Sequence, residues 1–175
     1  QTEVARRTPV TTDPMVLSIT RISAGTTHNV LPEAVELLGT LRTLSAAGRA
    51  RGRAAFELVC THVSLAHGCT ADVEIEAGYP ATINDPRAVA LIERLAGGDY
   101  ILAPAPSMGG EDFSYVLERI PGAMAFLGVA PSGGDPLARA PLHNPGMMVD
   151  EAAMPRGVAL HCAFATTFLS EGFTQ

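Results

Sequence analysis

The spacing of apolar residues predicts strands in the first half of the chain. Apolar and polar side chains alternate over residues 15–20, and a similar stretch spans residues 34–43 after a turn at 25–29. Alternation with β-branched residues is typical of strands, so these two stretches predict a hairpin. Residues 69–77 alternate most clearly of all, which predicts a third strand with one buried and one exposed face.

Helices are predicted between and after these strands. Residues 46–66 carry apolar positions at helical spacing and end before Gly68, a residue that suits a helix terminus. Asp85 is a predicted N-cap with Pro86 at the first helical position, and that helix stops at Gly97. Two more helices, at 111–118 and 151–169, and a buried strand at 123–128 complete the prediction.

The order of these elements suggests a fold class. Residues 15–77 run strand–strand–helix–strand, which resembles a ferredoxin-like β-α-β-β-α-β unit without its first strand and most of its first helix. Residues 1–8 would be the end of that helix, so the chain is expected to start inside a domain. Beyond Gly78 the pattern is α/β. We therefore expect an α/β protein with two parts, 1–77 and 78–175.

The composition of the chain narrows the classes of partner that it could bind. The chain has 175 residues, is 47% hydrophobic and carries a net charge of −6, and each of its 12 basic residues is Arg. Without a basic cluster it is a poor nucleic-acid or membrane binder. No apolar run has the length of a membrane span, and no signal peptide is visible. Three cysteines at unrelated spacings predict reduced, mostly buried thiols in a cytoplasmic protein.

Two histidines are candidates for chemistry. His143 stands between Pro141 and Pro145, where flanking prolines would hold it as a metal ligand or general base. His28 lies beside Asn29 in the predicted hairpin turn. The alternative for each is an ordinary loop or turn residue. The remaining histidines, His62, His67 and His161, fall on predicted helices and are interpreted as structural.

An arginine and a pair of glycines are candidates for anion binding. Arg42 lies on a predicted strand, and if it faces inward it needs a carboxylate or another anion. Gly109 and Gly110 precede a predicted helix, a geometry that favours anions. The alternatives are an outward strand arginine and an ordinary helix start. No Gly-x-Ser-x-Gly motif is present, so a serine nucleophile is not supported.

Six segments together carry a resemblance to one family. The chain resembles the co-catalytic zinc amidohydrolases, which include aminoacylase, hippurate hydrolase, carboxypeptidase G-type enzymes and auxin-conjugate hydrolases, and the hippurate and auxin-conjugate branch is nearest. The segments follow the family's order over nearly the whole chain: residues 25–33, 39–44, 78–85, 107–115, 142–145 and 150–155.

The resemblance implies an architecture and a set of roles. Residues 1–77 would be the later part of a ferredoxin-like lid that forms a homodimer. Residues 78–175 would be the C-terminal part of an α/β catalytic domain. The implied site residues are His143 as a metal ligand, Asn29, Arg42 and, more weakly, His28 as contacts to the substrate and its carboxylate, and Gly109 with Gly110 at the edge of the pocket.

The implied activity is hydrolysis of an N-acyl amino acid, or of a peptide-like amide with a free carboxylate, with two divalent ions (zinc or manganese). The other metal ligands and the general base of the family have no counterpart here. We therefore expect no catalytic residue in this chain, no stably bound metal pair and no activity by the chain alone. The alternatives are a non-catalytic dimerisation or binding module, and one half of a split hydrolase.

Overall fold

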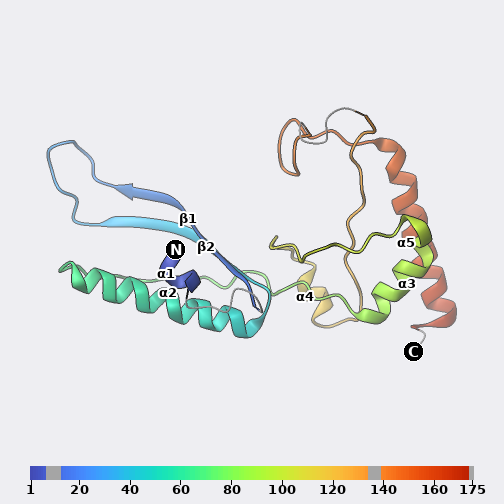
Figure 1. Cartoon of the computed structure of the whole chain (residues 1–175), viewed down its shortest axis with the longest axis horizontal. Coiled ribbons are helices and arrows are strands. Elements are labelled where there is room, and N and C mark those ends of the chain that lie inside the picture. Colours follow the sequence, from blue (N-terminus) through green and yellow to red (C-terminus); the bar gives the residue numbers. More distant parts are fainter. Residues whose placement is uncertain (7–12, 134–138, 174–175) are drawn as a thin grey trace. The chain divides into compact units, whose positions relative to one another are not determined.

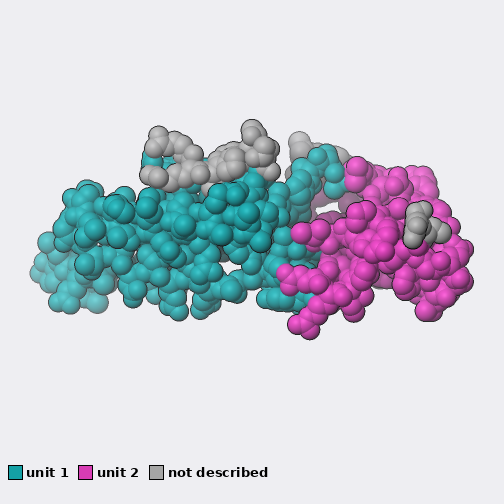
Figure 2. All heavy atoms as spheres, turned by 90° about the horizontal axis from the view of Figure 1, so that it is seen from below, with its two compact units in different colours: residues 1–82, 103–115 teal, residues 83–102, 116–175 magenta. Residues whose placement is uncertain are grey.

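The computed structural model describes residues 1–6, 13–133 and 139–173 in two compact units. The first contains residues 1–82 and 103–115, and the second contains residues 83–102 and 116–175 (Figure 2). Helices and a small antiparallel sheet confirm the predicted mixed α/β class. The assignment of 1–77 and 78–175 to a lid and a catalytic part stays a prediction.

The predicted hairpin forms in the first unit. β1 (Met15–Ala24) pairs antiparallel with β2 (Val35–Thr43), as Figure 1 shows. The register shifts between Ile19 and Arg21, which leaves one extra residue in β1, a β-bulge. A Cβ on Gly39 would lie 2.3 Å from the Ser18 carbonyl oxygen, so only glycine fits opposite the bulge.

The helix α2 (Ala46–Ala66) packs against the hairpin as the sequence predicts (Figure 1). Its N-cap is Ser45, whose hydroxyl accepts a hydrogen bond from the third helical amide at 2.8 Å. At the buried Gly52 a Cβ would lie 2.5 Å from Met15 Sδ and 3.1 Å from Leu41 Cδ2. The helix backbone therefore lies directly on the side chains of the hairpin, and this contact is the centre of the first unit.

The predicted third strand is wrong. Residues 69–77 form no strand, although Val73 and Ile75 are half-buried while Asp72 and Glu74 are exposed. The side chains therefore still alternate between half-buried and exposed positions. The segment is not a strand because, within the described part of the chain, no neighbouring strand pairs with it. Upstream, α1 (Thr2–Arg6) supports the helix predicted to end at residue 8, but residues 7 and 8 lie outside the described residues.

The regular elements described after α2 are all helices, joined by long irregular segments. α3 begins at Pro86 after the N-cap Asp85, as predicted, and packs against α5 with Leu91 buried (Figure 1). The bounds are α3 Pro86–Ala96, η1 Gly97–Asp99, α4 Ser114–Leu117, η3 Glu151–Ala153 and α5 Met154–Glu171. Within the described residues, no helix is long and apolar enough to cross a membrane.

Three local predictions need correction. The helix predicted over 111–118 is a single turn, α4. Residues 123–128 form no strand, and the backbone of Met124 is bonded to the side chain of Asn84, which donates to the Met124 carbonyl at 3.0 Å and accepts from the Met124 amide at 2.9 Å. The thiols are not mostly buried. Only Cys60 is half-buried, and that burial raises its pKa, whereas the other two cysteines, Cys69 and Cys162, are exposed.

Candidate functional site

Arg42 lies near the end of β2 and reaches a loop far along the sequence. Its side chain is exposed, which is the outward orientation that the sequence left open beside an inward one, and its Nη1 donates a hydrogen bond to the Met108 carbonyl at 3.2 Å. A Cβ on Gly110 would lie 3.6 Å from the same nitrogen. The first unit therefore brings together two of the predicted substrate-binding positions, Arg42 and Gly110.

The charge of Arg42 is not matched by a protein carboxylate. Among the described residues no aspartate or glutamate forms an ion pair with it, while five other arginines, Arg21, Arg51, Arg87, Arg94 and Arg156, each have such a partner. A guanidinium carries five N–H donors in a planar fork that matches a carboxylate. One bond to Met108 leaves most of these donors available to a ligand.

The glycine loop (residues 107–110) leaves space for a ligand, but it does not lead directly into a helix whose dipole could attract an anion. The Ser107 hydroxyl accepts a hydrogen bond from the Gly109 amide at 3.2 Å, which fixes a local turn. Helix α4 begins only at Ser114 and has four residues, so the helix start that was expected to attract an anion directly after the glycines does not form. At Gly110 the missing side chain leaves open the space beside Arg42.

The hairpin turn holds the other two predicted substrate contacts, Asn29 and His28. Both are exposed, and Asn29 Oδ1 accepts a hydrogen bond from Thr27 Oγ1 at 3.1 Å. Arg42 stands seven positions along β2 from Val35, at the opposite end of the hairpin. At about 3.3 Å per residue, this places the turn roughly 23 Å from Arg42. The structure does not bring Asn29 or His28 to Arg42 within one chain.

His143 occupies an unusual backbone conformation. The Asn144 amide donates to the Pro141 carbonyl at 3.1 Å, and this bond closes the His143 turn (residues 141–144). His143 itself has φ 69°, the single left-handed value for a non-glycine among the described residues. Such a conformation is uncommon for residues with a Cβ and is concentrated at functional sites. The imidazole is held on an exposed turn at an energetic cost, as a ligand-binding side chain can be.

A complete metal centre is not formed by these residues. Within the described ranges no group of three or more His, Cys, Asp and Glu side chains could hold an ion. Two metal ions need several protein ligands between them. His143 can donate one imidazole nitrogen, but the donor set described here does not fit a two-metal centre by itself.

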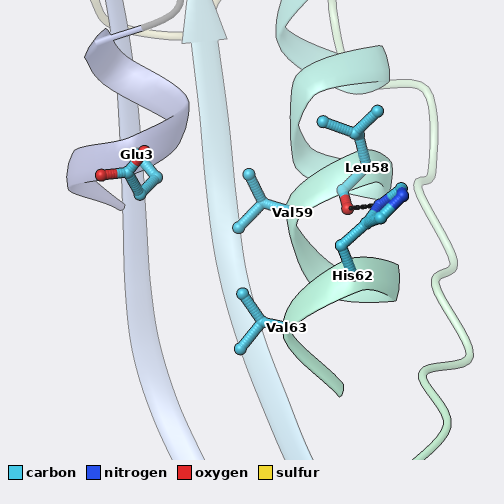
Figure 3. Close-up of a pocket in the computed structure, with 5 residues that line it drawn as sticks. All are labelled: Glu3, Leu58, Val59, His62 and Val63. Carbon is cyan, nitrogen blue, oxygen red and sulfur yellow. Dashed lines mark hydrogen bonds between the residues drawn. The ribbon is translucent and has the colours of Figure 1, made fainter. Parts of the chain in front are cut away.

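One hollow lies elsewhere in the first unit. A cavity of about 340 Å³ lies between α1 and α2, and Figure 3 shows Val59 and Val63 on the side of α2 that faces the strands. The His62 Nδ1 lies 2.8 Å from the Leu58 carbonyl on its own helix, which fits a structural role. None of the predicted site residues lines this cavity, which is mainly apolar. We interpret it as imperfect packing rather than as the site.

Sequence reasoning missed one neighbour of Arg42. A Cβ on Gly110 would lie 3.4 Å from Tyr79 Cδ2, so this ring borders the same space as the guanidinium. Tyr79 belongs to the segment 78–85, which the sequence marks as a boundary and as part of the family resemblance, but with no role for this ring. No spacing rule relates it to Arg42, since the loop contacts that bring them together are long-range.

The described residues thus place an exposed arginine fork beside a glycine loop, and a histidine with a left-handed backbone elsewhere in the chain. Comparison with known proteins gives the class. Residues 8–167 match the model of Peptidase family M20/M25/M40. The chain belongs to this family, which confirms the resemblance seen in the sequence.

Individual relatives agree with this membership. N-acetyl-L-cysteine deacetylase of Bacillus subtilis is 35% identical over 141 residues, which are 79% of this chain and 32% of the relative. A Bacillus subtilis structure described as a dinuclear metal-binding peptidase of the M20 family matches with a TM-score of 0.75 and 28% identity, over 89% of this chain and 42% of that one.

Another relative has a name of a different kind. A Rhodococcus jostii protein that carries the name glutamate–cysteine ligase 2-3 is 37% identical over 147 residues, 82% of this chain but 18% of the relative. Because so little of that protein is matched, its name is no guide to this chain. The chain spans between about a fifth and two-fifths of the length of these relatives.

Proposed function

We propose that this chain is the C-terminal part of a metal-dependent amidohydrolase that cleaves N-acyl amino acids or related amides with a free carboxylate. A Bacillus subtilis relative named for N-acetyl-L-cysteine deacetylation supports this substrate class. In this proposal the general base and most metal ligands come from residues outside the chain. The chain alone therefore hydrolyses nothing.

The observation that carries the proposal is the arrangement around Arg42. Its guanidinium lacks a carboxylate partner among the described residues, is exposed, and faces a loop whose Gly110 leaves space beside it. A bidentate pair with the substrate carboxylate uses this fork fully. By fixing that end of the substrate, Arg42 sets the position of the scissile amide relative to the reacting groups.

His143 has the complementary role on the acyl side. We propose that it donates one ligand to a metal pair of the complete enzyme, zinc or manganese, as the M20 peptidase of known structure has a dinuclear centre. Such a pair, when bound, polarises an amide carbonyl and activates water. The contribution of this chain is to hold one imidazole on a rigid turn.

The separation of the hairpin turn from Arg42 suggests how Asn29 and His28 take part. A small substrate cannot span roughly 23 Å, so one copy cannot contact it with both ends of the hairpin. We propose that the protein is a homodimer in which the turn of one copy reaches the substrate held by the partner's arginine. The hairpin has exposed apolar residues suited to such an interface: Ile22, Val35, Leu37 and Leu38.

The role of Arg42 is tested with the intact enzyme on an N-acetyl amino acid and on the matching amide, which lacks the carboxylate. Arg42→Gln should raise KM for the acid at least about tenfold, the loss of a charge-assisted hydrogen-bond pair, and leave the amide unchanged. Arg94→Gln, which removes an exposed ion pair in the second unit, is the control. Equal losses on acid and amide would contradict the carboxylate role.

The dimer is tested by mixing Arg42→Gln with Asn29→Ala at a substrate concentration well below the wild-type KM, where each variant alone should lose most of its activity. If the two residues come from different copies, half of the randomly formed dimers are mixed and each has one intact site. Activity should then return to about a quarter of the wild-type value. If both residues act within one copy, mixing restores nothing.

The mass of the natural protein separates the proposal from a stand-alone binding module: it should lie well above the 18.2 kDa of this chain.

A further inference from the structure

One aromatic ring lies beside the proposed carboxylate-binding arginine, and a second ring packs against the first. A Cβ at Gly110 would lie 3.4 Å from Tyr79 Cδ2 and 3.6 Å from Arg42 Nη1, so the ring and the guanidinium border the same space. Tyr115 meets Tyr79 edge to face, with ring centroids 5.9 Å apart and planes at 79°. We call Tyr79 and Tyr115 the tyrosine pair.

The tyrosine pair is positioned by contacts from separate segments of the first unit. Arg49 of α2 donates a hydrogen bond to the Tyr79 carbonyl, which ties this segment to the helix. The Tyr115 amide donates to the Asp112 carbonyl at 3.0 Å, which places its ring at the end of the glycine-loop segment. The edge-to-face contact then joins the two segments. Each ring therefore has a defined neighbour without a bound ligand.

Despite these contacts, the rings remain open to solvent. Tyr79 and Tyr115 are 50% and 49% exposed. A tyrosine pair with one ring next to a charged fork has two chemical parts, one for an anion and one for a flat or bulky apolar group. Because Gly110 has no side chain, it fills neither part.

We infer that the tyrosine pair is the subsite for the side chain of the amino acid whose carboxylate Arg42 binds. This inference rests on the proposed function. In an amino acid the carboxylate and the side chain share one carbon atom, so a carboxylate on Arg42 places the side chain next to the fork. The acyl group lies further away, beyond the amide nitrogen. The ligands favoured are therefore N-acyl amino acids with aromatic side chains over N-acylglycines.

The composition of the chain makes the test direct. It has three tyrosines and no tryptophan, and the third tyrosine, Tyr100, lies in the second unit. The 175-residue chain is labelled with 3-fluorotyrosine and titrated with N-acetyl-L-phenylalanine while the ¹⁹F resonances are recorded. N-acetylglycine tests the side chain, and N-acetyl-L-phenylalaninamide tests the carboxylate. Tyr100 is the internal reference.

The expected result is a shift of the Tyr79 and Tyr115 resonances, but not of Tyr100, with N-acetyl-L-phenylalanine. N-acetylglycine should bind about five- to tenfold more weakly, the value of aromatic contacts. Tyr79→Ala should remove this preference and Tyr79→Phe should keep it, since the ring and not the hydroxyl makes the contact. Tyr100→Ala should change nothing.

Two failures are distinguishable. If both acids bind equally, and binding requires Arg42, the side-chain subsite is wrong and the carboxylate role stands. If the amide binds as well as the acid, or if Arg42→Gln changes nothing, the carboxylate role itself fails and the inference fails with it. Absence of any shift at the tyrosine pair at saturating ligand overturns the subsite directly.

Discussion

The surroundings of Arg42 and of His143 are built in different ways. The first depends on contacts between segments far apart in sequence: Arg42 with Met108, 66 positions away, and Arg49 with Tyr79, 30 positions away. The His143 turn is closed by its own neighbours, through the Asn144 amide and the Pro141 carbonyl. The first arrangement therefore exists only when the fold around it exists, and the second is largely local.

Local bonds like those of the His143 turn also occur elsewhere in the second unit, beside long-range bonds such as that of Asn84 with Met124. Asp85, Asn144 and Asp150 each accept a hydrogen bond from the backbone amide two residues on, at 2.8, 2.8 and 3.0 Å. These are local side-chain to backbone bonds that favour turns and helix starts. A substitution in the hairpin should therefore disturb a distant loop, whereas a substitution at a cap or turn should act where it is made.

The largest effect is expected from Gly39→Ala. The added Cβ would lie 2.3 Å from the Ser18 carbonyl oxygen, and this contact is with backbone that cannot rotate away. The bulge must rearrange, which should cost about 2 to 4 kcal/mol of unfolding free energy and displace Arg42, three residues on. Urea denaturation measures the first effect and binding of N-acetyl-L-phenylalanine the second.

The matched control is Gly128→Ala, where a Cβ meets nothing within 4 Å. It should leave both stability and ligand binding within error of the wild type. If Gly39→Ala were as mild as this control, the dependence of Arg42 on the sheet would be wrong.

A smaller effect on stability, caused by the backbone conformation and not by a steric clash, is expected at His143. His143→Gly and His143→Ala both remove the imidazole, but only glycine adopts φ 69° without cost. The glycine variant should therefore be about 1 kcal/mol more stable than the alanine variant, while both lose the same activity in the intact enzyme. Thermal unfolding and an N-acyl amino acid assay measure the two properties. Equal stabilities would mean that the turn relaxes in the variants.

Local signals in the sequence were sufficient for local structure. The cap at Asp85 with Pro86, the end of α2 near Gly68 and the hairpin were all predicted, because each follows from a few adjacent side chains. The apolar runs at 69–77 and 123–128 were misread as strands. Periodicity reports which side chains are alike, but a strand also needs a neighbour that supplies hydrogen bonds.

The sequence predicts which residues have the chemistry of the candidate site, but not how these residues are arranged in space. Arg42, Gly109 and Gly110 were selected for their chemistry, and the structure places Arg42 beside the glycine loop. It also separates them from Asn29, which the sequence had grouped with Arg42. The role of Tyr79 was missed, because its position depends on Arg49 and on the path of the chain between distant segments. Long-range packing decides such neighbours, and no short motif encodes it.

The smallest effect is a pH dependence at Asp85, the local cap of α3. Hydrogen bonds from the Arg87 side chain, and then from the Arg87 amide, lower the pKa of Asp85 to about 2. Since this pKa is below the ordinary value of about 3.9, the carboxylate stabilises the folded chain above that value. The contribution is lost as pH falls from there towards 2.

Asp85→Asn should therefore lower the urea midpoint at pH 7 slightly, and the difference from wild type should shrink as pH falls through this range. Because Asp85 is paired with an exposed arginine, salt should also reduce the difference at pH 7. The same substitution at the exposed Asp72, which has no cap to lose, is the control. A difference that persists unchanged at pH 2 would mean that the asparagine variant loses something other than the charge, and the cap would then stabilise α3 through its geometry alone.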